Sequence, residues 1–432
     1  MKMNATRLSR PTQLAKQSKS PLSFTTNILI VGGAYAGLSA LKNLVQFFGE
    51  KIENSKHGGT VEGNKISLTI IEPKGGLLNI LGIPRAIVDP VFAKTQFVPF
   101  AQLRGLKFKS VLSSDEKVLE SFNDSEPTNE PVVDINYVHG HVSQLGPNEA
   151  KYKLNNIPVE CDIKFDYVIY GAGRNRHWPI SPSAFDANLY VSEMIAVKDE
   201  IEKAEALSII GGGAVGVELA GEIKSHFPHK TVNLIHPHGN LPKEPLSEKF
   251  KETVLESLKR AKVDVHLNTR ISKELENNDL ETTKGDVIHS SLNFWCNSYK
   301  NNTQILTENM KYFVSENNNI FVNEYSQVSH NGKTLTNFFA IGDLVEQPII
   351  KSAGWAMYMG KHAANNVSEM ILNGNVIEQF VDLNTMQRGM VLIAGNEDVI
   401  SQSCGEIELN NEKFVENYQD YCFEVVREKL GL

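Results

Sequence analysis

The sequence has few cysteines and lacks any closely spaced pair of them. Its four cysteines, Cys161, Cys296, Cys404 and Cys422, are too far apart for a C-x-x-C or C-x₄-C motif. This spacing excludes a redox-active disulfide between neighbouring cysteines and offers no zinc or iron–sulfur ligand pattern. We therefore expect reduced thiols and no metal site.

The chain also lacks a long apolar run and an excess of basic residues. No run approaches the roughly 20 apolar residues of a membrane-spanning helix. The 51 acidic residues outnumber the 43 basic ones, which gives a net charge of −8. A nucleic-acid surface needs a basic footprint instead. These absences argue against a nucleic-acid partner and a transmembrane segment, and they leave peripheral membrane contact open.

The most informative stretch is residues 207–221, which read LSIIGGGAVGVELAG. A short β-type run is followed by Gly211, Gly213 and Gly216, which fill the three glycine positions of G-x-G-x-x-G. The first glycine permits the tight turn, the second the approach of a pyrophosphate, and the third close packing of helix and strand. The amides at the start of the helix face the phosphates. This context predicts a dinucleotide site, in which we include Glu218.

The residue expected to contact the adenosine ribose of this dinucleotide is His236. It follows a predicted strand at 231–235, at the position where NAD-specific proteins place an acid that binds the ribose hydroxyls. Histidine neither binds them as an acid does nor repels a 2′-phosphate, and a protonated imidazole would attract phosphate. We therefore predict that NADPH is accepted alongside NADH. His238 and Lys243 would extend a phosphate-tolerant rim, unless they are merely solvated.

A second glycine motif lies upstream at residues 27–37, NILIVGGAYAG. Alanine stands where the middle glycine of the motif would be, which adds one methyl group at the point of closest phosphate approach. Two nucleotide folds in one chain imply two nucleotides, or one nucleotide and one electron carrier that receives its hydride. The predicted contacts of the first motif are Gly32, Gly33, Ala34, Tyr35, Ala36 and Gly37.

Further ligand contacts are predicted at three strand ends. The strand at 66–71 ends in Glu72, an acid placed to bind a ribose hydroxyl pair, after a polar stretch at 49–65 that we interpret as an inserted surface loop. Gly171 follows the strand at 166–170, where a small residue permits close backbone approach.

The third strand end is the segment 337–343, NFFAIGD, which places Asp343 between a buried strand and a helix at 352–367. Asp343 would accept a hydroxyl from a ribityl or ribose chain, or else it caps the helix. The positive amino end of that helix, with Lys351 ahead of it, suits a reduced flavin, which carries negative charge.

The two ends of the chain lie outside the nucleotide motifs. Residues 1–25 are basic and free of acids, which is typical of a mitochondrial presequence but equally of a disordered tail. At the carboxyl end we expect a hairpin at 390–408 and a final helix. An apolar stripe on that helix predicts core packing, with a membrane or partner face as the alternative; its members are Phe414, Tyr418, Tyr421, Cys422 and Val425.

The order of Gly32–Gly37, Glu72, GGGAVGVELAG, VNEYSQV and FFAIGD along the chain resembles that of the flavoproteins with two dinucleotide domains, the pyridine nucleotide-disulfide oxidoreductase superfamily. Within it, PRAIVDPVFAKTQF makes the chain most similar to the apoptosis-inducing-factor-like group, which includes ferroptosis suppressor protein and fungal mitochondrial homologues. NFWCNS at 293–298 departs from the family, which usually ends this strand in Thr-Gly.

The resemblance implies an α/β fold with two Rossmann-like domains, the second inserted in the first, and a small C-terminal α+β region. The FAD domain would comprise residues 26–189 and 311–375, the NAD(P) domain residues 190–310, and the C-terminal region residues 376–432. The resemblance also implies that FAD is held by Gly32–Gly37, Glu72, Arg85, the strand around Val142, and Asp343.

The activity implied is hydride transfer from NAD(P)H to FAD, which needs proximity and orientation rather than a catalytic acid or base. Without a disulfide, the electrons would pass to a quinone or similar acceptor. A reductase of a small electron-transfer protein is one alternative. A redox sensor of the cell-death type, with little turnover, is another. The expected location is the mitochondrion or the cytoplasm.

Overall fold

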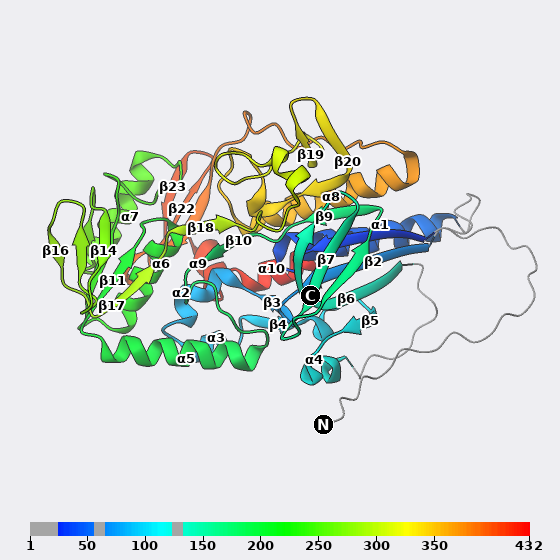
Figure 1. Cartoon of the computed structure of the whole chain (residues 1–432). Helices are drawn as coiled ribbons and strands as arrows, with labels where there is room; N and C mark the ends of the chain where they lie inside the picture. Colours follow the sequence, from blue (N-terminus) through cyan, green and yellow to red (C-terminus); the bar gives the residue numbers. More distant parts are fainter. Residues whose placement is uncertain (1–24, 56–64, 123–132) are drawn as a thin grey trace, which may run out of the picture.

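The computed structural model describes residues 25–55, 65–122 and 133–432. The predicted presequence or tail at 1–25 therefore lies outside the described residues, except for its last position. Two sheets flanked by helices occupy opposite ends of the molecule in Figure 1, and the carboxyl-terminal elements lie between them.

The larger sheet carries the first glycine motif. Its parallel strands follow the order β20-β9-β1-β2-β6. Helices α1 (Tyr35–Ser55) and α8 (Ala353–Asn373) pack against each other beside this sheet. Its strands are β1 (Thr25–Val31), β2 (Lys65–Glu72), β5 (Phe108–Leu112), β6 (Val133–Leu145), β7 (Glu149–Leu154), β8 (Glu160–Lys164), β9 (Tyr167–Tyr170), β19 (Gln327–His330) and β20 (Lys333–Ala340).

The smaller parallel sheet carries the second motif, in the strand order β13-β12-β11-β17. All five residues of β11 are buried, as expected for a parallel strand covered by helices on both faces. The elements of this unit are α5 (Ala187–Lys203), β11 (Ala206–Ile210), α6 (Ala214–His226), β12 (Thr231–Ile235), α7 (Glu248–Arg260), β13 (Asp264–His266), β14 (Ile271–Glu274), β15 (Leu280–Thr282), β16 (Val287–Ile288) and β17 (Leu292–Trp295).

The chain segment that forms the smaller sheet is inserted, in sequence, between strands β9 and β20 of the larger sheet. Strands β9 and β20 are parallel neighbours, with Phe338 opposite Val168, although the whole second unit lies between them in sequence. The chain leaves and returns through β10 (Arg174–Arg176) and β18 (Ser298–Asn301), which pair with each other. The predicted α/β class with two dinucleotide folds is therefore confirmed.

The carboxyl-terminal region differs from its prediction in two ways. The expected hairpin is a three-stranded sheet of β21 (Met390–Ile393), β22 (Val399–Ser403) and β23 (Glu406–Leu409). The expected single helix is interrupted, because Tyr421 and Cys422 adopt left-handed backbone angles, with φ of 54° and 58°.

This interruption separates α9 (Glu412–Tyr418) from α10 (Phe423–Leu430). Val426, rather than the predicted Val425, is therefore the buried valine of the last helix. The expected loop at 49–65 is also partly wrong, since α1 continues to Ser55.

Short elements complete the larger unit. They are β3 (Gly76–Leu78), α2 (Ile83–Ala86), α3 (Pro90–Ala93), β4 (Phe97–Pro99) and α4 (Glu116–Ser121).

Candidate dinucleotide sites

The two glycine motifs form the same turn at the carboxyl ends of β1 and β11. Gly32 has a φ of +101° and Gly211 a φ of +124°, a backbone region that disfavours residues with a Cβ. A methyl group on Gly37 would collide with the carbonyl of Gly32, and one on Gly216 with that of Gly211. Glycine at the third position is thus required because helix and strand are in direct contact.

Each turn is also bonded to the residue that follows the neighbouring strand. The Gly33 amide donates to Glu72 Oε2 (2.6 Å), and the Gly212 amide donates to His236 Nδ1 (3.1 Å). Both acceptors occupy the position at which ribose recognition was predicted. The structure therefore brings Glu72 and His236 to equivalent places in the two motifs.

The bonds of Glu72 leave it able to accept further donors. Its Oε1 accepts the Lys74 amide at 3.0 Å, and a carboxylate has about four acceptor positions in total. Burial raises the pKa of Glu72, and its two amide donors act in the opposite direction. A ribose hydroxyl pair would add two further stabilising donors to this half-buried acid.

His236 presents a donor rather than an acceptor. Its side chain is only 3% exposed, and burial, followed by nearby His238, Lys243 and Lys251, lowers its pKa to about 4. Because Nδ1 accepts the Gly212 amide, the neutral ring carries its hydrogen on Nε2. Nε2 is buried without a hydrogen-bond partner among the described residues. The protonated form considered in the sequence analysis is therefore not the form of the free protein at neutral pH.

The amino end of α1 is open around Ala34. Ala34 is exposed, and its carbonyl accepts the Leu38 amide at 2.9 Å, which starts the helix. The adjacent Tyr35 is buried, and its hydroxyl donates to Asn79 Oδ1 at 2.6 Å. Ala36 is buried beside them. Because Ala34 is exposed, this helix end is accessible to a phosphate, even with the added methyl group.

Asp343 lies in a cluster of basic residues. Its carboxylate is 3.0 Å from Arg174 Nε and 3.9 Å from Arg176. Lys351 Nζ donates to the Val345 carbonyl at 2.6 Å, and burial lowers the lysine pKa to about 8. The two arginines were not predicted as site residues, although the sequence RNR, separated by three residues from the end of β9, was a usable signal.

Gly171 lies beside the first turn, whereas Val142 lies further from it. Gly171 bonds Val31 through its amide, and a Cβ on Gly32 would lie 2.6 Å from the Gly171 carbonyl oxygen, so the structure brings Gly171 beside the turn. Val142 lies further along β6 than His139, the partner of Glu72, and is buried in the core.

Arg85 does not contact the first turn in this structure. Its Nε and one terminal nitrogen are each 3.0 Å from Glu222 Oε1, and its guanidinium lies 5.1 Å from the centre of the Tyr421 ring. The Tyr421 hydroxyl donates to the same Glu222 oxygen at 2.6 Å. Arg85 thus joins α2, α6 and the carboxyl-terminal segment.

Glu218 lies one turn before Glu222 on α6 and is partly buried. Burial, together with the charges of Glu222 and Glu244, raises the pKa of Glu218 to about 8. A carboxyl group with this pKa is largely protonated at neutral pH.

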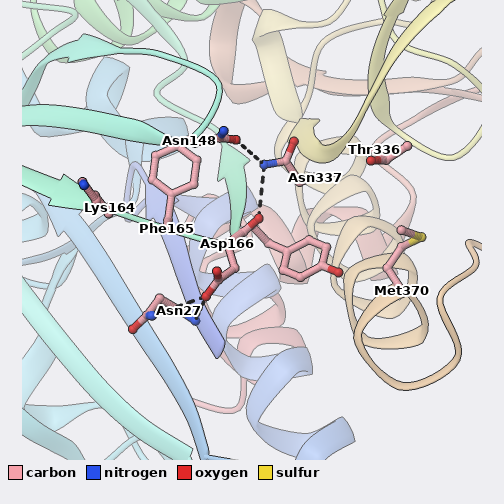
Figure 2. Close-up of a pocket in the computed structure, with 9 residues that line it drawn as sticks. Asn27, Asn148, Lys164, Phe165, Asp166, Thr336, Asn337 and Met370 are labelled. Atoms are coloured by element: carbon pink, nitrogen blue, oxygen red, sulfur yellow. Dashed lines mark hydrogen bonds between the residues drawn. The ribbon is translucent and has the colours of Figure 1, made fainter. Parts of the chain in front are cut away.

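A cavity of about 510 Å³ lies near the amino ends of β1 and β9 in the larger sheet. Figure 2 shows Asn337 within it, whose Nδ2 donates to Asn148 Oδ1 and to the Asp166 carbonyl, both at 3.1 Å. Asn27, near the start of β1, also lines the cavity. Because the glycine turn follows the other end of β1, this cavity is separate from both motifs.

The described residues contain no group of histidines, cysteines or acids that could hold a metal ion. Within the same ranges, no helix is long and apolar enough to cross a membrane. All four cysteines are free thiols.

The model of the pyridine nucleotide-disulphide oxidoreductase family matches residues 26–360. The chain belongs to this family. The match spans both glycine motifs and Asp343, so the resemblance stated from the sequence is confirmed. This family is one of oxidoreductases that use pyridine nucleotides.

Several curated relatives match most of the chain. Oxidoreductase OXR1 from Ajellomyces capsulatus is 26% identical over 85% of this chain and 78% of its own length. Ferroptosis suppressor protein 1 from Mus musculus is 31% identical over 80% of both chains. Apoptosis-inducing factor homolog B from Dictyostelium discoideum is 23% identical over 79% of this chain and 81% of its own.

Solved structures share the fold at lower identity. NDH2 from Plasmodium falciparum, solved with NADH, aligns with a TM-score of 0.66 and 12% identity over 94% of this chain and 97% of that one. An NAD-dependent persulfide reductase from A. fulgidus aligns with a TM-score of 0.59 and 17% identity, over 91% and 66%. These two likenesses concern the fold alone.

Proposed function

We propose that the chain is an FAD-dependent oxidoreductase that takes a hydride from NADH or NADPH and passes the electrons to a quinone-like acceptor. The observation that carries the proposal is the duplicated turn, in which Gly33 and Gly212 each donate to the residue after the neighbouring strand. Two such turns in one chain provide one site for a resident flavin and one for an exchangeable nucleotide.

The residues of the first motif fit FAD. Gly32 and Gly37 keep the turn tight, the amino end of α1 is accessible at Ala34, and half-buried Glu72 has acceptor positions for hydroxyl groups. When bound there, FAD would supply the two-electron redox chemistry. Asp343, Arg174 and Lys351 would bind polar or negatively charged parts of the cofactor.

The residues of the second motif fit NAD(P)H. The buried Nε2–H of His236 lacks a partner among the described residues, and such groups in native proteins usually bind a ligand or water. A ribose oxygen or a 2′-phosphate oxygen would each accept this hydrogen. The proposal of a dual nucleotide preference rests on that neutral donor.

A quinone-like acceptor is favoured because the chain offers no internal dithiol. Cys296 and Cys422 are both partly buried, and burial raises the pKa of each thiol to about 12. Thiols with such pKa values remain protonated and unreactive at neutral pH. A diffusible two-electron acceptor then has to remove the electrons.

The test is anaerobic reduction of the purified full chain by NADH or NADPH, followed by addition of separate acceptors. We expect bound FAD to be bleached by either nucleotide and reoxidised fastest by a short-chain quinone, ahead of cytochrome c or a small disulfide. Absence of flavin, or of its reduction, would overturn the proposal. Tight nucleotide binding with negligible turnover on every acceptor would instead support the redox-sensor alternative.

A further inference from the structure

The segment between β12 and α7 folds back over the second glycine turn. The Lys243 amide donates to the Gly212 carbonyl at 3.2 Å. The next residue is Glu244, whose Oε1 accepts the amide of Ala214 at 3.3 Å. Ala214 is the first residue of α6. A methyl group on Gly213 would lie 3.4 Å from the same oxygen. A carboxylate therefore lies where the glycine motif would place a dinucleotide phosphate.

We propose that Glu244 is an internal competitor of the dinucleotide pyrophosphate, which has to displace its carboxylate from the amino end of α6. This inference rests on the proposed function, because it assumes that NAD(P)H binds at the second motif. A pyrophosphate and a carboxylate are both negative and use the same backbone amides. They cannot occupy this helix end together without strong repulsion.

The bonding of Glu244 indicates that it can be displaced. Its single described hydrogen bond from α6 is long, and its Oε2 is buried with no partner among the described residues. An unsatisfied buried carboxylate oxygen carries a desolvation penalty. The carboxylate of Glu244 is also felt on α6, where it contributes to the raised pKa of Glu218.

The first motif provides an internal comparison. Ala34 occupies the position of Gly213, and the described residues place no acid on the amides that start α1; the nearest bonded carboxylate, Glu72, accepts from Gly33 and Lys74 instead. In the second motif, His236 accepts the Gly212 amide and so corresponds to Glu72 of the first motif. Glu244 is thus an additional acid with no counterpart in the first turn.

The buried His236 Nε2 is independent evidence for a ligand at this turn. It lies on the strand end beside Gly212, it is unpartnered among the described residues, and it is not a contact of Glu244. A nucleotide that binds His236 with its adenosine ribose would bring its pyrophosphate to the helix end. The unpartnered Nε2–H of His236 and the amides at the start of α6 could therefore bind two parts of one nucleotide.

The experiment measures the affinity of the full, flavin-loaded chain for ADP-ribose by calorimetry and for NADH by fluorescence. Glu244→Gln keeps an acceptor for the Ala214 amide but removes the charge, and Glu244→Ala removes both. We expect both variants to bind ADP-ribose about tenfold more tightly than the unmodified protein. The matched control, Glu252→Gln, removes an exposed acid on α7 and should leave the affinity unchanged.

The possible results separate this inference from the proposed function. If the unmodified protein binds NADH but neither Glu244 variant binds ADP-ribose more tightly, the inference is wrong and the proposed function stands. Weaker binding by both variants would show that Glu244 is a nucleotide ligand, which also overturns the inference. If neither the unmodified protein nor any variant binds either probe, both proposals fail. Flavin content and melting temperature report whether each variant is folded.

Discussion

Replacing His236 by glutamate should convert a protein that accepts both nucleotides into one that prefers NADH. The first motif shows that a glutamate fits this position, because Glu72 accepts the Gly33 amide in the same way as His236 accepts the Gly212 amide. In His236→Glu, the carboxylate would bind the ribose hydroxyls of NADH and repel the 2′-phosphate of NADPH.

The magnitude follows from the charges involved. In the unmodified protein, the neutral Nε2–H can donate to either ligand, a bond worth about 0.5–1.5 kcal/mol to a hydroxyl and roughly 1.5–3 kcal/mol to a charged oxygen. We therefore expect kcat/KM for the two nucleotides to agree within a factor of ~100, or ~2.7 kcal/mol. A carboxylate about 4 Å from a phosphate at an effective dielectric constant of ~20 adds a repulsion of about 4 kcal/mol per pair of unit charges. That repulsion corresponds to roughly a thousandfold shift toward NADH.

Steady-state kinetics with NADH and NADPH on both proteins test this expectation. Equilibrium binding of ADP-ribose and its 2′-phosphorylated form separates affinity from turnover. His229→Glu is the matched control, because His229 is exposed and precedes β12, at the end of the strand away from His236, and a distant solvated charge is screened. A preference of the unmodified protein for NADH well beyond the factor of ~100, or an unchanged ratio in His236→Glu, would refute the reasoning.

Three further predictions follow from the same geometry. Gly213→Val should keep the flavin but lose flavin reduction by NADH in anaerobic spectra. A Cβ added at Gly213 would have only Glu244 Oε1 among the described atoms near it, at 3.4 Å, so the valine side chain would occupy the space of the ligand and not that of the protein core. Reduction at the unmodified rate would show that the motif is misassigned. Glu222→Ala should lower the free energy of unfolding in urea by about 2–3 kcal/mol, since the buried Tyr421 hydroxyl loses its acceptor and Arg85 loses its carboxylate while it retains the Gln419 carbonyl; a loss below about 1 kcal/mol would contradict this. Glu218 has a folded-state pKa of about 8 against an ordinary 4.5, so the folded chain holds a proton that the unfolded chain releases and stability should fall as pH rises from about 4.5 to about 8; Glu218→Gln should flatten that slope, and an identical slope in urea titrations at several pH values would disprove the assignment.

The glycine turns could be predicted from the sequence because they depend on local backbone requirements. Gly211 and Gly216 are fixed by a positive φ and by a helix–strand contact, and both constraints lie within a few residues. The positions of Glu72 and His236 followed from the ends of the predicted strands after each glycine motif. The same reasoning also located Asp343 at a strand end.

The partners of charged side chains could not be predicted, since they come from distant segments. Arg85 meets Glu222 and Tyr421 only because α2, α6 and the interrupted carboxyl-terminal helix come together. The interruption itself depends on two non-glycine residues with left-handed angles, which no helical periodicity reveals. Sequence spacing alone therefore could not determine whether Arg85 contacts a cofactor or another element of the protein.

The same kind of distant contact distinguishes the two dinucleotide sites from each other. The turns are alike in backbone, yet the first presents an accessible helix end beside half-buried Glu72, whereas the second has a carboxylate on the first amide of α6. A resident flavin needs a site that is always available, and an exchangeable nucleotide benefits from a group that replaces it on release. We infer that Glu244 keeps NAD(P)H affinity moderate, so that the oxidised nucleotide leaves after each turnover. Product release from Glu244→Gln should accordingly be slower than from the unmodified protein in stopped-flow measurements with NAD⁺, and an unchanged rate would contradict this role.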